Sequence, residues 1–239
     1  MRYPLAAGGK RIRPRLCLAA ARAAGADPAL ALPAAAAVEL VHTFSLVHDD
    51  LPALDDDDER RGRPSLHVAR GEAVAILAGD GLLNAAFRLV SEQLDIPAEV
   101  RLRVVAELAD GVAGMIDGQY LDVTAPEQDA DGLVRLHRLK TGSLISAAVA
   151  CGLHVGGLHP DAQRPFREFA AELGLLFQIV DDVLDAGADG PSYVRRHGLD
   201  GARRLAAAAR TRSLELLAAC PGETADLQAL VVEVADRDA

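Results

Sequence analysis

Apolar residues recur at intervals of three and four along nearly the whole chain, and the alternation typical of strands is rare. This spacing gathers apolar side chains on one face of a helix, so the pattern predicts an all-α protein. Only 3% of the 239 residues are aromatic and tryptophan is absent, so the core has to be built from alanine, leucine, valine and isoleucine. Such a composition favours closely packed helices over a β-sandwich.

Proline and glycine residues divide this pattern into separate helices joined by short connections. Short connections favour antiparallel packing of neighbouring helices in one bundle, and we find no linker that would divide the chain. We therefore expect a single domain over residues 1–239. The helices are predicted at residues 14–24, 33–50, 72–92, 98–123, 132–151, 162–185, 199–218 and 224–234.

The charge balance and the cysteines restrict the cellular setting. With 25 Lys and Arg against 35 Asp and Glu, the net charge is −10, which argues against nucleic acid as the main partner. Three widely spaced cysteines form no CxxC pair, which disfavours a disulfide framework or a thiolate zinc site. Arginines interrupt the apolar N-terminal stretch, and no run approaches about 18 uninterrupted apolar residues. We expect a cytoplasmic protein without a membrane span.

Two acid-rich segments, residues 48–61 and 178–185, each follow an apolar stretch. In the second, Asp181 and Asp185 are four residues apart and share a helix face among apolar neighbours. Like charges repel at this spacing, and a bound cation is the simplest compensation. Carboxylates without nearby cysteine favour Mg²⁺ or Mn²⁺, and Mg²⁺ usually bridges carboxylates to substrate phosphates. Two such clusters facing one cavity would therefore indicate a diphosphate substrate, although the acidic run 55–59 alone is typical of a solvated surface.

Basic residues that could bind such an anion are few and clustered. Lysine occurs only at positions 10 and 140. Lys10 and Arg13 follow Gly8-Gly9, where the absence of side chains lets the backbone approach an anion. Each basic feature has an ordinary explanation when taken alone: an exposed turn for Lys10, a snorkelling side chain for Lys140, and a surface ion-pair network for Arg60-Arg61.

In combination, these segments resemble the trans-polyprenyl (isoprenyl) diphosphate synthase family, and bacterial farnesyl diphosphate synthases in particular. The resemblance is strongest from the N-terminus to Asp185 and implies the isoprenoid synthase fold, an antiparallel helix bundle around a central cavity with two diphosphate sites. Members are commonly homodimers, so we expect a homodimer. The matching segments, in family order, are residues 8–14, 49–62, 77–80, 118–122, 140–142 and 177–185.

The resemblance assigns a role to each matched position. Mg²⁺ on the allylic diphosphate would be held by Asp49, Asp50 and Asp55 from one side and by Asp181, Asp182 and Asp185 from the other. Arg60, Lys140, Thr141 and Gln178 match the allylic site, and Lys10, Arg13, His42 and Arg61 match the isopentenyl diphosphate site. The expected catalytic residues are Asp49, Asp55, Asp181 and Lys140.

The implied reaction condenses isopentenyl diphosphate with dimethylallyl or geranyl diphosphate. Phe44 lies five residues before Asp49 and should point below the diphosphate site, where Phe44 and Ser45 would limit chain length. We predict a C15 product, farnesyl diphosphate. Geranylgeranyl or geranyl diphosphate synthase and a weakly active regulatory subunit are the alternatives. A terpene cyclase needs only one diphosphate site, and a purely structural metal protein leaves the basic residues unexplained.

Two regions depart from the family pattern. Family members usually carry tens of residues, including a helix, before the Met-Arg-Tyr segment that begins this sequence. They also have a lysine-containing loop after the second aspartate motif, whereas residues 186–193 contain no lysine. We expect a true deletion of that loop to leave the diphosphate less covered and to reduce turnover.

Overall fold

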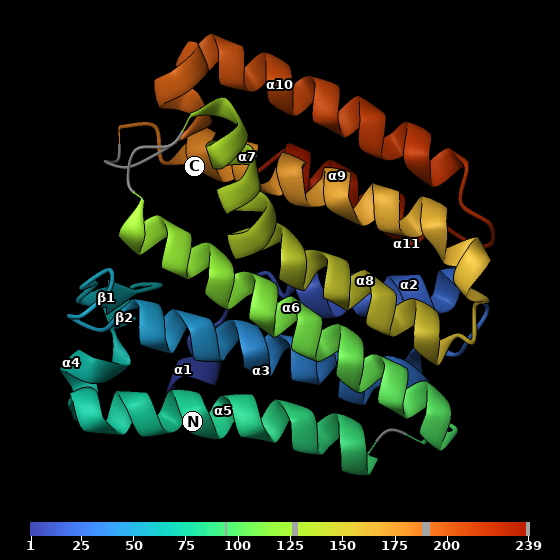
Figure 1. The fold of residues 1–239 in the computed structure, drawn as a ribbon, viewed down its shortest axis with the longest axis horizontal. Coiled ribbons are helices and arrows are strands. Elements are labelled where there is room, and N and C mark those ends of the chain that lie inside the picture. The colour runs from blue at the N-terminus through green and yellow to red at the C-terminus, as the bar shows by residue number, and fades with distance from the viewer. Residues whose placement is uncertain (94, 126–128, 188–191, 238–239) are drawn as a thin grey trace.

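The computed structural model describes residues 1–93, 95–125, 129–187 and 192–237, and helices dominate it (Figure 1). The predicted all-α class is confirmed; in the part of the chain just given, strands are confined to a small antiparallel pair, β1 (Glu59–Arg60) and β2 (Arg63–Pro64). The helices are α1 (Arg2–Leu5), α2 (Ile12–Ala23), η1 (Pro28–Ala31), α3 (Leu32–Asp49), α4 (Leu66–Arg70), α5 (Glu72–Gln93), α6 (Ala98–Thr124), α7 (Ala130–His137), η2 (Arg138–Gly142), α8 (Ser143–Val155), α9 (Pro160–Leu184), α10 (Tyr193–Ala218) and α11 (Ala225–Ala235).

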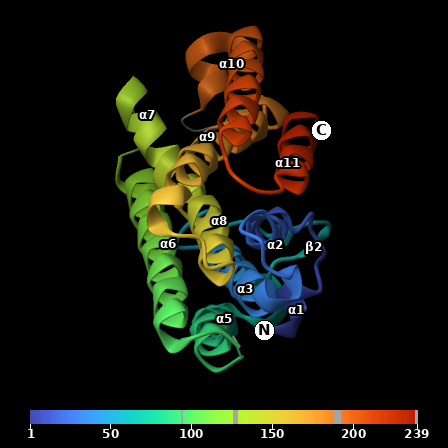
Figure 2. The ribbon, with the colours of Figure 1, turned by 90° about the vertical axis from the view of Figure 1, so that its right-hand side faces the viewer.

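Helix α8 forms the centre of the bundle, and α2, α3, α6 and α9 pack against it (Figure 2). Its sequence contains no acidic residue, lysine or arginine, and nearly every side chain from Leu144 to Val155 is buried. A helix that is apolar on all sides is expected inside a protein, which explains this position. Helix α5 flanks α3 at one edge, and α10 lies on α9 at the other (Figure 1).

Glycine and alanine allow the central helices to approach closely. A Cβ atom on Gly152 of α8 would collide with the Cys17 carbonyl of α2, and one on Gly118 of α6 would collide with the Lys140 backbone. Helices α2 and α3 also bury many alanines. Because few aromatic side chains are available to fill the interior, the helices pack closely across small residues instead.

The predicted helix at 132–151 differs in detail from the structure. It runs as α7, η2 and α8, and η2 is a single π-helical turn that contains Lys140. Such turns are often found at functional sites.

The segment around 186–193 also differs from expectation. Helix α10 begins at Tyr193 rather than near 199, because Ser192 caps the first turn and Gly198, with φ of 70°, forms a break where we expected the start. The part of the lysine-free segment at 188–191 lies outside the described residues.

Two described helical segments, Pro28–Asp49 and Glu72–Glu92, are long and apolar enough to cross a membrane by length and composition. Packing of α3 inside the bundle accounts for the first. The second lies at the edge of the bundle and leaves several large apolar side chains exposed.

Candidate functional site

A cavity of about 420 Å³ lies between α3, α6 and the η2–α8 segment. The lining residues of α6 recur at one-turn spacing, so this helix presents one stripe to the cavity. The polar end contains Asp49, Gln119 and Lys140, and the remaining wall is mostly apolar. The lining includes Phe44, Ser45, His48 and Asp49 of α3, Met115, Ile116, Gln119, Tyr120 and Val123 of α6, and Lys140, Thr141 and Leu144.

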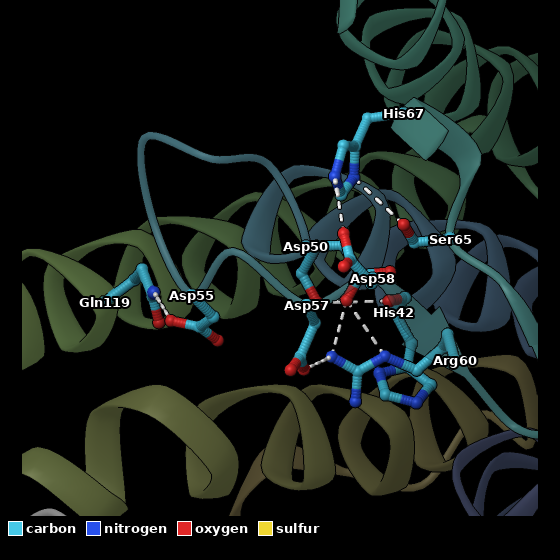
Figure 3. Close-up of polar contacts among 10 residues, drawn as sticks. His42, Asp50, Asp55, Asp57, Asp58, Arg60, Ser65, His67 and Gln119 are labelled. Atoms are coloured by element: carbon cyan, nitrogen blue, oxygen red, sulfur yellow. Dashed lines mark hydrogen bonds and ion pairs between the residues drawn. The ribbon is translucent and has the colours of Figure 1, made fainter. Parts of the chain in front are cut away.

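The first aspartate patch, which we define as Asp49, Asp50 and Asp55, begins at the end of α3. Asp50 is buried, and its Oδ1 accepts hydrogen bonds from Nε and Nη2 of Arg60, at 2.9 Å from Nε (Figure 3). Arg60 also pairs with Asp57 at 2.6 Å. Asp55 is exposed and accepts a hydrogen bond of 3.4 Å from the Gln119 amide. Arg60 is therefore held by the acidic segment.

Asp49 is the patch member that lines the cavity. Burial raises its pKa to about 7; the positive charge of Lys140 opposes this shift, while the charges of Asp55 and Asp50 add to it. A nearby cation would strongly stabilise the ionised form of a carboxyl in this setting.

Lys140 reaches the cavity from the π-helical turn and donates a hydrogen bond of 2.5 Å to Oδ2 of Asp122. Gly118 lies one turn before Asp122 on α6, and its lack of a side chain lets the Lys140 backbone approach α6 closely. Asp122 belongs to the 118–122 segment recognised from the sequence, but we did not predict it as a site residue. Its role depends on a contact between two helices that no local pattern reveals.

The second aspartate patch, defined as Asp181, Asp182 and Asp185, adjoins the cavity through hydrogen bonds. The Thr141 hydroxyl donates a hydrogen bond of 2.8 Å to the side-chain oxygen Oε1 of Gln178. The side-chain amide of Gln178 in turn donates one of 2.8 Å to Oδ1 of Asp182. The other Asp182 oxygen accepts from the Tyr193 backbone N–H at 2.7 Å. Asp182 thus anchors the start of α10, and the metal role predicted for it stays a prediction.

The other two members of that patch differ in exposure, since Asp185 is exposed and Asp181 is half-buried. Burial raises the pKa of Asp181 to about 6, against the positive charges of Arg237 and Arg13. Arg13 lines the cavity, so its influence on Asp181 places the second patch beside the same space.

A second cavity of about 400 Å³ brings together all four residues predicted for isopentenyl diphosphate: Lys10, Arg13, His42 and Arg61. Arg61 donates a hydrogen bond to the Gly8 carbonyl, and its guanidinium lies against Gly9. The φ angles of 79° at Gly8 and 123° at Gly9 favour glycine in this turn. Burial, followed by the charges of Arg13 and Arg61, lowers the pKa of His42 well below its ordinary value, which keeps the ring neutral.

Two further basic residues in the lining of this cavity, Arg11 and Arg237, were not predicted from the sequence. Arg11 forms an ion pair with Glu39. Arg237 lies just beyond α11, far along the chain from the second aspartate motif, so only the tertiary structure reveals its position.

The donor set fits a hard divalent cation. Asp49 and Asp181 are half-buried carboxylates whose pKa values are raised by desolvation, and a bound cation would stabilise their ionised forms. Over the described ranges, however, no three or more His, Cys, Asp or Glu side chains converge to hold a metal by themselves. This arrangement fits Mg²⁺ that is completed by substrate phosphates rather than a cage made of protein alone.

Comparisons with known proteins agree with these features. The polyprenyl synthetase family model matches residues 1–217. A farnesyl diphosphate synthase of Geobacillus stearothermophilus is 51% identical over 191 residues, covering 77% of this chain and 64% of that enzyme. A chloroplastic geranylgeranyl pyrophosphate synthase of Catharanthus roseus is 42% identical over 260 residues, covering 100% of this chain and 73% of that protein. The chain thus spans less than two thirds of the length of the Geobacillus enzyme.

A solved structure shows the same fold. The geranyltransferase of Helicobacter pylori, complexed with magnesium and isoprenyl diphosphate, matches with a TM-score of 0.86 and 30% identity. The match covers 97% of this chain and 84% of the other.

Proposed function

The chain belongs to the polyprenyl synthetase family, and from this membership we propose that it condenses isopentenyl diphosphate with an allylic diphosphate. The product would be a short-chain prenyl diphosphate, most directly farnesyl diphosphate. One observation carries the proposal: a mostly apolar cavity with Asp49 and Lys140 at its polar end adjoins a second cavity lined by Lys10, Arg13 and Arg61. Two diphosphates and one growing hydrocarbon chain require this combination.

The basic residues would bind and orient the two substrates. Lys140 and Arg60 are placed to neutralise the departing allylic diphosphate, and Lys10, Arg13 and Arg61 to hold isopentenyl diphosphate. As the allylic C–O bond breaks, the alkene of isopentenyl diphosphate attacks the cation, and a proton is lost to the departing diphosphate. The apolar wall, including Met115 and Leu144, would exclude water from the carbocation.

Mg²⁺, or Mn²⁺, would be held by Asp49 and Asp55 of the first patch and by Asp181 and Asp185 of the second. When bound, it supplies Lewis-acid stabilisation of the diphosphate leaving group. With the metal bound, Asp49 and Asp181 would both be ionised. The raised pKa values of these two carboxyls therefore belong to the metal-free state only.

We further propose that a second copy of the chain binds across α5 and α6. Leu77 of α5 is 70% exposed, and Leu102 and Tyr120 of α6 are 69% and 66% exposed. Helices with such large exposed leucines and aromatics favour association with another apolar surface. Ile116, Tyr120 and Val123 also line the cavity, so a partner over α6 would complete its wall.

The activity test supplies the purified chain with isopentenyl diphosphate, dimethylallyl or geranyl diphosphate, and Mg²⁺. The products are dephosphorylated and sized by chromatography. We expect farnesol from the wild-type chain, none after chelation, and a loss of about 100-fold or more in Asp181→Asn, because removing a metal ligand weakens leaving-group stabilisation by several kcal/mol.

Asp200→Asn, at an exposed position of α10, is the matched control and should keep full activity. Full activity in Asp181→Asn would contradict the metal role. A silent chain that stimulates an added synthase would instead indicate a regulatory subunit, and a C20 product would indicate a geranylgeranyl diphosphate synthase.

A further inference from the structure

The guanidinium of Arg237 is fixed between α9 and the end of α11. Its Nη1 lies 2.9 Å from Oδ1 of Asp181, and Nη2 donates to the Phe177 carbonyl at 3.3 Å. The guanidinium carbon lies 4.0 Å from the centre of the Phe177 ring, and Nε donates to the Val234 carbonyl at 3.3 Å. The side chain is only 9% exposed, so these contacts define one position.

This position lies on the boundary between the two proposed substrate sites. Arg237 lines the basic cavity together with Lys10, Arg13 and Arg61, yet its charge pairs with Asp181, which belongs to the aspartate patch. A carboxylate oxygen engaged by a guanidinium is less available to a second cation, and the two positive charges would repel.

We propose that Arg237 is a positioning residue that occupies Asp181 as a substitute cation in the metal-free protein and yields this carboxylate when a divalent metal binds. The released guanidinium then faces the basic cavity, where an anionic diphosphate is its natural partner. This inference rests on the proposed function, because it takes Asp181 as a metal ligand. Arg237 directly follows Asp236, the C-cap of α11, so its displacement would leave the helical residues of α11 in place.

The test titrates Mn²⁺ alone into the full chain and measures free Mn²⁺ by electron paramagnetic resonance. Arg237→Met keeps an aliphatic stem on Phe177 but removes the competing charge. It should bind Mn²⁺ about fivefold more tightly, the equivalent of a shielded ion pair of about 1 kcal/mol. Arg237→Lys keeps the charge and should remain near the wild-type affinity.

Arg22→Gln is the matched control, because it removes the ion pair of Arg22 with Asp226 at the opposite end of α11. We expect wild-type Mn²⁺ affinity for it. Equal tightening in Arg22→Gln would show that loosening α11 is sufficient and would overturn the proposal, as would unchanged or weaker binding in Arg237→Met.

Asp181→Asn separates this inference from the proposed function. If it binds Mn²⁺ as tightly as the wild type, Asp181 is not a ligand, and this inference fails together with the metal role proposed for Asp181. The prenyltransferase activity itself is then judged by the product assay. If it loses affinity while Arg237→Met is unchanged, only the role of Arg237 fails. On the unmodified chain, the ¹⁵N-arginine Nε–H signal assigned to Arg237 by its loss in Arg237→Lys should shift or broaden at saturating Mg²⁺ and pyrophosphate. An unchanged signal contradicts the proposal even if the methionine variant does not fold.

Discussion

At the scale of single residues, several cations in and beside the proposed site are already paired with carboxylates. Arg60 is held by Asp50, and Lys140 is held by Asp122. Arg237 is paired with Asp181 in the same way. Each of these three cations already has a carboxylate partner before substrate arrives. Binding a diphosphate would therefore exchange one anionic partner for another. This limits the cost of keeping so many charges in partly buried positions.

The buried carboxyl of Asp49 should make the stability of the metal-free protein depend on pH. Its pKa rises from 3.8 to about 7 in the folded state, so the folded form binds the proton more tightly than the unfolded form. The stabilisation is fully present below pH 3.8 and is lost as the pH rises through about 7. In chelator, Asp49→Asn should therefore match the wild type near pH 4 and exceed its free energy of unfolding at pH 8, by on the order of 2 kcal/mol.

Denaturant unfolding at both pH values measures this difference. Other groups, such as Glu107 with its pKa lowered to about 2 by His154 and Arg167 against its burial, are present in both proteins and cancel. A stability difference that does not change with pH would contradict the assignment.

Phe44 should set the length of the product. It lines the same cavity as Asp49, and its ring meets the His48 ring edge-on at a centroid distance of 5.0 Å. Phe44→Ala removes the ring from the path of the growing chain, so we expect products longer than C15. Phe87→Ala, on a partly buried phenylalanine of α5 outside the cavity lining, is the control for general loosening. Chromatography of the dephosphorylated products reads the result, and an unchanged C15 limit would refute the assignment.

At the scale of helices, the apolar period predicted every long element of the fold. The helices at 72–92 and 98–123, for example, correspond to α5 and α6 within two residues at each end. The π-helical turn at Lys140 was not predictable, because one extra residue in a turn barely changes a spacing of three and four. Strands as short as β1 and β2 are likewise too brief for alternation to be recognised.

The candidate site was predictable to a similar degree. Residues within recognised segments, such as Asp49, Lys140 and Arg13, do line the two cavities. Arg237 and Asp122 were missed as site residues because their partners, Asp181 and Lys140, lie on other helical segments. Asp122 falls within a recognised segment, but no local pattern shows that it pairs with Lys140. Local patterns therefore locate the groups that carry chemistry, whereas tertiary packing decides which residues hold them.

The contact between α6 and η2 should tolerate no side chain at Gly118. Gly118→Ala would push its Cβ into the Lys140 backbone and displace the turn that carries Lys140 and Thr141. We expect a loss of about 1–3 kcal/mol in the free energy of unfolding, together with a raised KM for the allylic substrate. Gly142→Ala is the matched control, because its Cβ would meet only atoms at 3.8 Å or more. Equal effects in the two variants would show that steric contact at Gly118 is not the cause.

At the scale of the whole molecule, the exposed apolar faces of α5 and α6 should be covered by a second copy. Leu77→Glu combined with Leu102→Glu places charges on both faces, and burying them in an interface is unfavourable. We expect the wild-type chain to sediment as a dimer and this variant as a monomer in analytical ultracentrifugation.

Leu205→Glu is the control for whether a glutamate at any exposed leucine disrupts the dimer. Leu205 is 37% exposed and lies on α10, which is at the opposite edge of the bundle from α5 (Figure 1). This control should remain dimeric. A wild-type monomer at micromolar concentration, or a double variant that still dimerises, would contradict the proposed interface.

The scarcity of lysine, together with the pairing of Lys140 with Asp122, gives the molecule an unusual reactivity toward acylating reagents. Lys10 and Lys140 are the only side-chain amines in the sequence, and each lines a different cavity. Peptide mass mapping after brief labelling would therefore report the two anion sites separately, with exposed Lys10 labelled first and Lys140 slowed by its carboxylate partner.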